Sequence, residues 1–303
     1  MQHVPVLVDA VVAVLSGCKG TIVDGTFGRG GHSRVLLEKL PPDGQLLVID
    51  RDEEAVACAL RLAEEDKRVL VVKGNFSVLP EILEEQRLGK VSGILLDLGT
   101  SSPQLDNAAR GFSFMADGPL DMRMDQSAEL TAEQWLAMAT PEEMAKVFFE
   151  YGEEKFSRRI ARAIVEFRLV ERLHSTLQLV NIIKSAQPRL DKNKHAATRV
   201  FQAIRIHIND ELGAIRKGLE GCFESLEKGG KLAVISFHSL EDRIVKRTFK
   251  GWVKGDIPRR LPVMGEVLGK AKFVIRMQRA SDQEVGQNPR SRSAILRVIE
   301  KLG

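Results

Sequence analysis

A glycine-rich segment is the first feature of this sequence that could do chemistry. Residues 24–33 read Asp-Gly-Thr-Phe-Gly-Arg-Gly-Gly-His-Ser, between a β-type run at 20–23 and a helical pattern at 35–40. Glycines tolerate positive φ and let a ligand approach the backbone, and a helix start offers unpaired N–H groups. A strand, a glycine-rich turn and a helix in this order are typical of a nucleotide-binding corner, although such turns also occur in ordinary loops.

Two further residues strengthen the nucleotide hypothesis. Asp50 ends the β-type run 45–49 and lies 20 positions after Gly30 (50 − 30), which is the usual place for a carboxylate that binds ribose hydroxyls. Phe76, with Asn75 before it, follows the run 69–72. A polar–aromatic pair at the end of a strand could frame an adenine ring.

Asp97 and His238 are the candidates for catalysis. Asp97 closes the β-type run 93–97, and His238 lies just past the run 231–236, so both are expected to face one cleft at the strand ends. A histidine there could accept a proton or contact a substrate. The alternatives are a helix cap or loop hydrogen bond for Asp97 and a structural hydrogen bond for His238.

The elements that must position these residues alternate along the chain. Residues 21–97 contain four continuous apolar runs separated by helical patterns, which is typical of a parallel sheet covered on both faces. A fifth run follows at 231–236, and only a polar loop joins the last two runs, 272–277 and 294–299. We therefore expect those two to pair antiparallel, whereas a nicotinamide-binding domain would carry another crossover helix there. An α/β sheet of five parallel strands with a terminal antiparallel hairpin is the Rossmann-like architecture of class I S-adenosylmethionine (SAM)-dependent methyltransferases.

The alternation stops after Asp97, and no clear β-type run occurs between 98 and 230. Residues 131–187 are predicted to be helical, with capping-box patterns at two helix starts. We expect a discontinuous methyltransferase domain, 1–105 and 196–303, interrupted by a small all-α domain, 106–195. A long helix, from about 196 to 226, would return the chain to the main domain. Its polar residues in one arc of about 120° are predicted to line a cleft and contact the substrate: Arg199, Gln202, Arg205 and Asn209.

Composition places few limits on the class of protein. The 303 residues have an excess of four cationic side chains (45 Lys+Arg against 41 Asp+Glu), a bias compatible with a nucleic-acid partner. The three cysteines, Cys18, Cys58 and Cys222, fit neither a zinc site nor a disulfide framework. We expect a reducing, cytoplasmic setting, without a signal peptide or membrane span.

Several long motifs, in the right order, resemble the bacterial small-subunit ribosomal RNA (cytosine-N4)-methyltransferases, the RsmH/MraW family. They cover nearly the whole chain: DGTFGRGGHS at 24–33, LDLG at 96–99, SSPQLD at 101–106, RGFSF at 110–114, DGPLDMRMD at 117–125, RVFQAIR at 199–205, NDE at 209–211, SFHSLEDR at 236–243 and NPRS at 288–291.

The resemblance implies an enzyme that methylates the exocyclic N4 amine of one cytidine in 16S ribosomal RNA near the decoding centre, with SAM as donor. The implied partner is the small ribosomal subunit with its 16S RNA; no membrane and no metal are expected, and the sequence is compatible with a homodimer without fixing the oligomeric state. The inserted domain would help recognise the substrate. The implied SAM contacts are Gly30, Gly31, His32, Asp50, Phe76, Asp97 and Gln104.

Methyl transfer to a cytosine amine sets requirements on this site. The reaction is an in-line displacement, so positioning should supply much of the rate, and the amine must lose a proton. We expect Asp97 to help bind SAM, and the turn that contains Ser102 and Pro103 to present acceptors to the amine. Gln104 stands where many amino-methyltransferases have an aromatic residue, so Phe112 and Phe114 are the candidates for stacking on the base.

Basic residues of the expected inserted domain could contact phosphate: Arg158, Arg159, Arg162, Arg168 and Arg172. A solvated helix face paired with nearby glutamates is the alternative. Two further classes of function remain open. One is a nicotinamide oxidoreductase, which the terminal hairpin disfavours; the other is a non-catalytic RNA-binding or ribosome-assembly protein that retains the fold.

Overall fold

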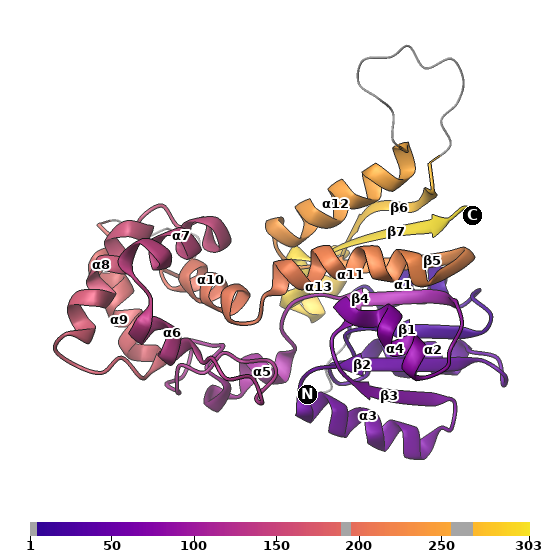
Figure 1. The fold of residues 1–303 in the computed structure, drawn as a ribbon, viewed down its shortest axis with the longest axis horizontal. Helices are drawn as coiled ribbons and strands as arrows, with labels where there is room; N and C mark the ends of the chain where they lie inside the picture. Colours follow the sequence, from indigo (N-terminus) through magenta and orange to yellow (C-terminus); the bar gives the residue numbers. More distant parts are fainter. Residues whose placement is uncertain (1–4, 189–194, 256–268) are drawn as a thin grey trace, which may run out of the picture. The chain divides into compact units, whose positions relative to one another are not determined.

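The computed structural model describes residues 5–188, 195–255 and 269–303 (Figure 1). The chain divides into two compact units. The first consists of residues 1–99 and 212–303, and the second of residues 100–211. Among the described residues, no helix is both long and apolar enough to cross a membrane.

A seven-stranded sheet forms the first unit, in the order β3-β2-β1-β4-β5-β7-β6. The pairs among β1 to β5 are parallel, and β7 runs antiparallel to both β5 and β6. This is the predicted class I methyltransferase sheet with its terminal hairpin. The strand bounds are β1 Thr21–Asp24, β2 Gln45–Asp50, β3 Val69–Lys73, β4 Val91–Asp97, β5 Leu226–Ser236, β6 Ala271–Arg279 and β7 Ile295–Lys301.

Helices accompany the parallel strands because each crossover needs one. The central residues of the inner strands are mostly apolar and buried; Leu46, Ile94 and Val298 are each 0% exposed. The helical elements of this unit are α1 Val8–Leu15, α2 Gly31–Lys39, α3 Glu53–Glu65, η1 Phe76–Val78, α4 Leu79–Glu85, α11 Glu211–Ser225, α12 Ser239–Lys254, α13 Asp282–Gln287 and η3 Pro289–Ser293. The polar segment between β6 and β7 contains α13 and η3, but no crossover helix, as expected.

The second unit is helical and has a hydrophobic core of its own. Both predicted capping boxes are present, Thr131 with Gln134 and Thr140 with Glu143. The core includes Phe148 and Ile164, each 0% exposed. Its elements are α5 Ser102–Asp106, η2 Ala108–Arg110, α6 Ala132–Met138, α7 Pro141–Gly152, α8 Ser157–Arg168, α9 Thr176–Ala186 and α10 Thr198–Ile208.

The structure corrects the prediction of one helix from 196 to 226. The segment forms two helices, α10 and α11, and Asp210 between them has a positive φ of 44°. Helix α10 buries Val200 and Phe201 in the core of the helical unit. The unit boundaries therefore fall after Gly99 and after Glu211, rather than after 105 and 195, because the apolar face of α10 belongs with α6 to α9.

Candidate active site

The glycine-rich segment forms a tight turn between β1 and α2. Gly28 and Gly30 have φ of 58° and 75°, and a Cβ on Gly30 would lie 2.6 Å from the ring of Phe27. The turn is fixed to both neighbouring strands, because Gly25 N donates to Leu95 O at 2.9 Å and Phe27 N donates to Ile49 O at 3.1 Å. The sequence therefore needs glycine here, as predicted, and α2 starts at this turn without a side-chain cap.

Asp50 accepts hydrogen bonds from the turn. Gly28 N donates to its Oδ2 at 2.8 Å, and Asp52 N donates to its Oδ1 at 2.9 Å. Burial raises the pKa of the Asp50 carboxyl, and these two hydrogen bonds oppose the rise. Because each carboxylate oxygen has two acceptor positions, this geometry leaves capacity for ribose hydroxyls.

Asp24 holds the other side of the turn. Ser33 Oγ donates to its Oδ2 at 2.6 Å, and Thr26 N donates to its Oδ1 at 3.1 Å. Its side chain is 1% exposed, and burial raises its pKa. We assigned Asp24 no role from the sequence, although its place at the end of a strand and the start of the turn was a usable signal.

Asp97, at the end of β4, has a carboxylate oxygen without a partner. Its N–H donates to Thr26 Oγ1 at 2.6 Å, and its Oδ2 lies 3.7 Å from His32 Nδ1. Its Oδ1 is buried and makes no hydrogen bond with the residues that the structure describes, although the side chain as a whole is 26% exposed. Burial raises the pKa of Asp97 to about 6, and the charges of Asp24 and Glu241 add to the rise while His32 opposes it.

His32 contacts Asp97 from a buried position. Its Nε2 lies 2.8 Å from Val6 O, and a carbonyl oxygen can only accept, so Nε2 carries a proton. The other ring nitrogen, Nδ1, is then turned toward the Asp97 carboxylate. His32 is 6% exposed, so the described contacts give it a role in positioning Asp97; the predicted contact with SAM stays a prediction.

His238 lies at the start of α12 beside a buried carboxylate. Its Nε2 is 3.1 Å from Glu241 Oε1, and the two side chains are 11% and 0% exposed. Phe237 N and His238 N both donate to Glu241 Oε2, at 2.8 and 3.2 Å. Glu241 was missed in the sequence analysis, although a glutamate three residues into a predicted helix signals a capping box.

Phe76 and Gln104, two implied SAM contacts, have structural partners. Phe76 is 8% exposed, and a Cβ on Gly218 would lie 2.5 Å from its ring. In the helical unit, Gln104 Oε1 accepts from Ser101 N at 3.0 Å and completes the capping box of α5. Ser102 and Pro103 form the first turn of that helix.

The two phenylalanines proposed to stack on a base differ in accessibility. Phe112 is 5% exposed in the core of the helical unit, so the structure disfavours it as a stacking platform. Phe114 is only partly buried. Its ring stacks on His195 with centroids 4.5 Å apart and meets Phe201 edge-on at 5.2 Å.

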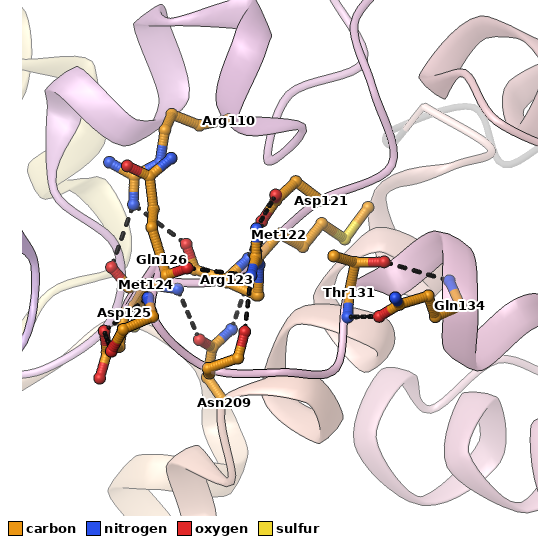
Figure 2. A network of polar contacts seen from close by, with 12 residues as sticks. Arg110, Asp121, Met122, Arg123, Met124, Asp125, Gln126, Thr131, Gln134 and Asn209 are labelled. Atoms are coloured by element: carbon orange, nitrogen blue, oxygen red, sulfur yellow. Dashed lines mark hydrogen bonds and ion pairs between the residues drawn. The ribbon is translucent and has the colours of Figure 1, made fainter.

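The polar arc predicted on α10 is mostly engaged within the helical unit. Asn209 Oδ1 accepts from Met124 N, and Asn209 Nδ2 donates to Met122 O, each at 2.7 Å (Figure 2). Arg205 Nε donates to Glu211 Oε1 at 2.7 Å, and Gln202 Nε2 donates to Tyr151 O at 3.0 Å. These three side chains therefore have partners within the helical unit, Arg199 is partly exposed, and the predicted contact with the substrate stays a prediction.

The residues of the first unit fit a cationic nucleoside ligand. Asp24, Asp97 and Glu241 interact electrostatically, one buried oxygen of Asp97 lacks a partner, and the start of α2 lacks a cap. An ionised carboxylate without a partner is costly to bury. A ligand with a sulfonium and an ammonium group, such as SAM, would relieve that cost.

We predict that Asp97→Asn stabilises the protein above pH 6. The raised pKa means that the folded state retains a proton that the unfolded state releases above about pH 4. The retained proton stabilises the folded state fully at low pH. This contribution to the free energy of unfolding is lost as the pH rises through about 6. The gain at pH 7.5 should be at most about 3 kcal/mol, from a pKa moved from 3.8 to about 6.

Urea unfolding of Asp97→Asn and the wild type between pH 5 and 8 checks this prediction. The difference in their free energies of unfolding should become smaller toward pH 5. Asp66→Asn is the control of opposite sign, because hydrogen bonds from Arg68 lower the pKa of Asp66 to about 2. A destabilised Asp97→Asn at pH 7.5 would contradict the prediction.

Solved structures give only weak matches. An rRNA methylase from Streptococcus thermophilus is 10% identical, with 98% of this chain and 94% of that chain covered and a TM-score of 0.43. TrmN from Thermus thermophilus is 11% identical; the match covers 98% of this chain and 48% of TrmN, with a TM-score of 0.44. These two likenesses carry no argument about function.

The comparison with protein families is decisive. The sequence model of the MraW methylase family matches residues 1–302, which is nearly the whole chain. The match agrees with the sheet order, the glycine turn and the resemblance of the motifs. This protein therefore belongs to the MraW methylase family and is a methyltransferase whose methyl donor is S-adenosylmethionine.

Proposed function

We propose that the protein methylates the exocyclic N4 amine of a cytidine in 16S ribosomal RNA near the decoding centre. Membership of the MraW methylase family supports methyl transfer. The observation that carries the chemistry is the Asp97 carboxylate at the end of β4, because its buried Oδ1 has no partner in the described part of the chain. The nature and position of the base come from the resemblance of the motifs.

Asp97 is proposed to act through its charge. SAM supplies an electrophilic methyl group on a positively charged sulfur, so an ionised carboxylate nearby favours binding of the donor. With a pKa of about 6, Asp97 is largely ionised at neutral pH and becomes protonated in mild acid. The hydrogen bond from Asp97 N to Thr26 Oγ1 fixes the backbone of Asp97 at the strand end, and His32 Nδ1 lies 3.7 Å from its carboxylate.

His238 is proposed to take the proton that the amine releases. A cytosine amine is a weak nucleophile whose N–H groups become acidic as the new bond forms. Glu241, fully buried 3.1 Å from His238 Nε2, would orient the ring. The structural alternative remains open, since the same contact would also support the start of α12.

Residues of the helical unit are proposed to bind the RNA. Ser102 and Pro103 would contact the amine, Phe114 the base, and Arg199 the backbone. On α8, Arg158, Arg159 and Arg162 are exposed and suited to phosphates. Two other arginines that the sequence suggested have partners in the protein: Arg168 donates to Leu136 O and Ala139 O, and Arg172, with an 80% exposed side chain, pairs with Glu133.

A non-catalytic RNA-binding or assembly protein is the alternative function. The Asp97 site disfavours it, because a buried carboxylate with a strongly raised pKa costs stability and is typical of a functional site. A protein without a donor to bind would gain stability from a neutral residue at position 97.

We expect methyl transfer from labelled SAM to the N4 amine of one cytidine of 16S ribosomal RNA. The assay compares naked RNA with assembled small subunits and maps the modified base by mass spectrometry. Asp97→Ala should lower both donor affinity and turnover. Donor binding without transfer to either substrate would support the assembly role, and a product methylated elsewhere would overturn the proposed target.

We predict that His238→Ala lowers kcat about 100-fold, the lower end of the range for general acid–base catalysis. His238→Gln is the matched variant, because it keeps a polar side chain next to Glu241 but does not titrate. Both variants should lose turnover, with little change in donor affinity. If glutamine restores wild-type turnover, the role of His238 is structural.

A further inference from the structure

Helix α12 carries a basic stripe on its exposed face. At 100° per residue, five cationic side chains fall within an arc of about 100°. Val245, Phe249 and Trp252 are buried on the opposite side, where the helix packs on β5, β6 and β7 (Figure 1). The basic stripe consists of Arg243, Lys246, Arg247, Lys250 and Lys254, all of them exposed.

The net charge of the chain is concentrated in this segment. Residues 243–254 contain five Lys or Arg and no Asp or Glu, whereas the whole chain has 45 against 41. The remaining residues therefore have 40 cationic and 41 acidic side chains, a net charge of −1. A solvated face of an ordinary helix usually mixes both signs of charge, and this one does not.

Four of the five cationic side chains of the stripe have no carboxylate partner among the described residues. Within the described residues, Lys246, Arg247, Lys250 and Lys254 make no ion pair. Asp242, just before the stripe, pairs instead with the buried Arg297 at 2.7 Å. Like charges three and four residues apart repel one another, so the stripe favours an anionic partner.

The stripe starts next to the candidate active site. Helix α12 follows the carboxyl end of β5, where Ile235 pairs with Asp97 of β4. From Arg243 to Lys254 the helix rises about 16 Å, starting just over one turn beyond His238. A linear polyanion lying along α12 would therefore have one end near the strand tips.

We propose that the basic stripe binds the phosphate backbone of the RNA substrate beside the target nucleotide. This inference rests on the proposed function and adds a binding surface to it. Phosphates repeat along an RNA strand, so a line of cations fits them. A membrane surface fits poorly, because interfacial helices place large apolar residues beside the cations, and α12 has no exposed large apolar side chain.

The test compares two variants of the full chain that lose equal charge. The stripe variant is Lys246→Gln, Arg247→Gln, Lys250→Gln and Lys254→Gln. The control is Lys19→Gln, Lys39→Gln, Lys67→Gln and Lys228→Gln, four exposed lysines at the amino-terminal edge of the sheet. Binding of naked 16S ribosomal RNA and of small ribosomal subunits is measured from 50 to 300 mM salt, together with SAM affinity and methyl transfer.

For the stripe variant, we expect the slope of log K against log salt to become shallower by about 0.7 for each phosphate that is no longer neutralised, thus by up to about 3. Its kcat/KM for RNA should fall at least tenfold with unchanged SAM affinity, while the control stays within twofold of wild type.

Three results would overturn the proposal in distinguishable ways. Equal effects of the two variants, with RNA methylated by the wild type, would reject the basic stripe and leave the proposed function. A stripe variant that fails to bind small subunits but binds naked RNA normally would assign the stripe to a protein partner. A wild type that transfers no methyl to RNA would reject the function and, with it, this inference.

Discussion

The structure depends on the burial of carboxylates at one edge of a parallel sheet. Three neighbouring strands, β2, β1 and β4, end in Asp50, Asp24 and Asp97, and burial raises the pKa of all three. Two of them offset their desolvation with hydrogen bonds from the glycine turn, which they fix in return. Asp97 does not, and its unpartnered oxygen leaves the edge prepared for a cation.

The three aspartates differ in what they bind: Asp24 and Asp50 bind groups of the protein itself, whereas Asp97 is left to interact with a ligand. Asp24 and Asp50 bind backbone N–H groups and a serine hydroxyl within the protein. His32 and Thr26 hold Asp97 without satisfying Oδ1. Such a site costs stability in the absence of ligand, and binding of the donor would recover part of it.

Much of the fold could be predicted from the sequence because its signals are local. Continuous apolar runs indicated the strands, the polar segment before β7 indicated the antiparallel pair, and Thr131 and Thr140 marked helix starts. The break between α10 and α11 was missed, because one residue at positive φ, Asp210, leaves the apolar periodicity on both sides intact.

The site was less predictable, since side-chain partners are set by tertiary contacts. Asn209 lies on the expected polar arc, yet its amide is used by the backbone of Met122 and Met124, 87 and 85 residues away. Phe112 and Phe114 look alike in sequence and differ in burial. Conversely, the basic stripe of α12 is readable from spacing alone, but only the structure reveals that no described carboxylate neutralises its lysines.

Calorimetry of SAM binding in buffers of different ionisation enthalpy tests the central claim most directly. If the cation of the donor meets the Asp97 carboxylate, binding at pH 6 should release about half a proton, because the pKa of about 6 falls in the complex. Release should vanish at pH 8 and in Asp97→Asn, which should also bind the donor more weakly. Proton release at pH 6 that is unchanged by Asp97→Asn, or none at all in the wild type, would contradict the account.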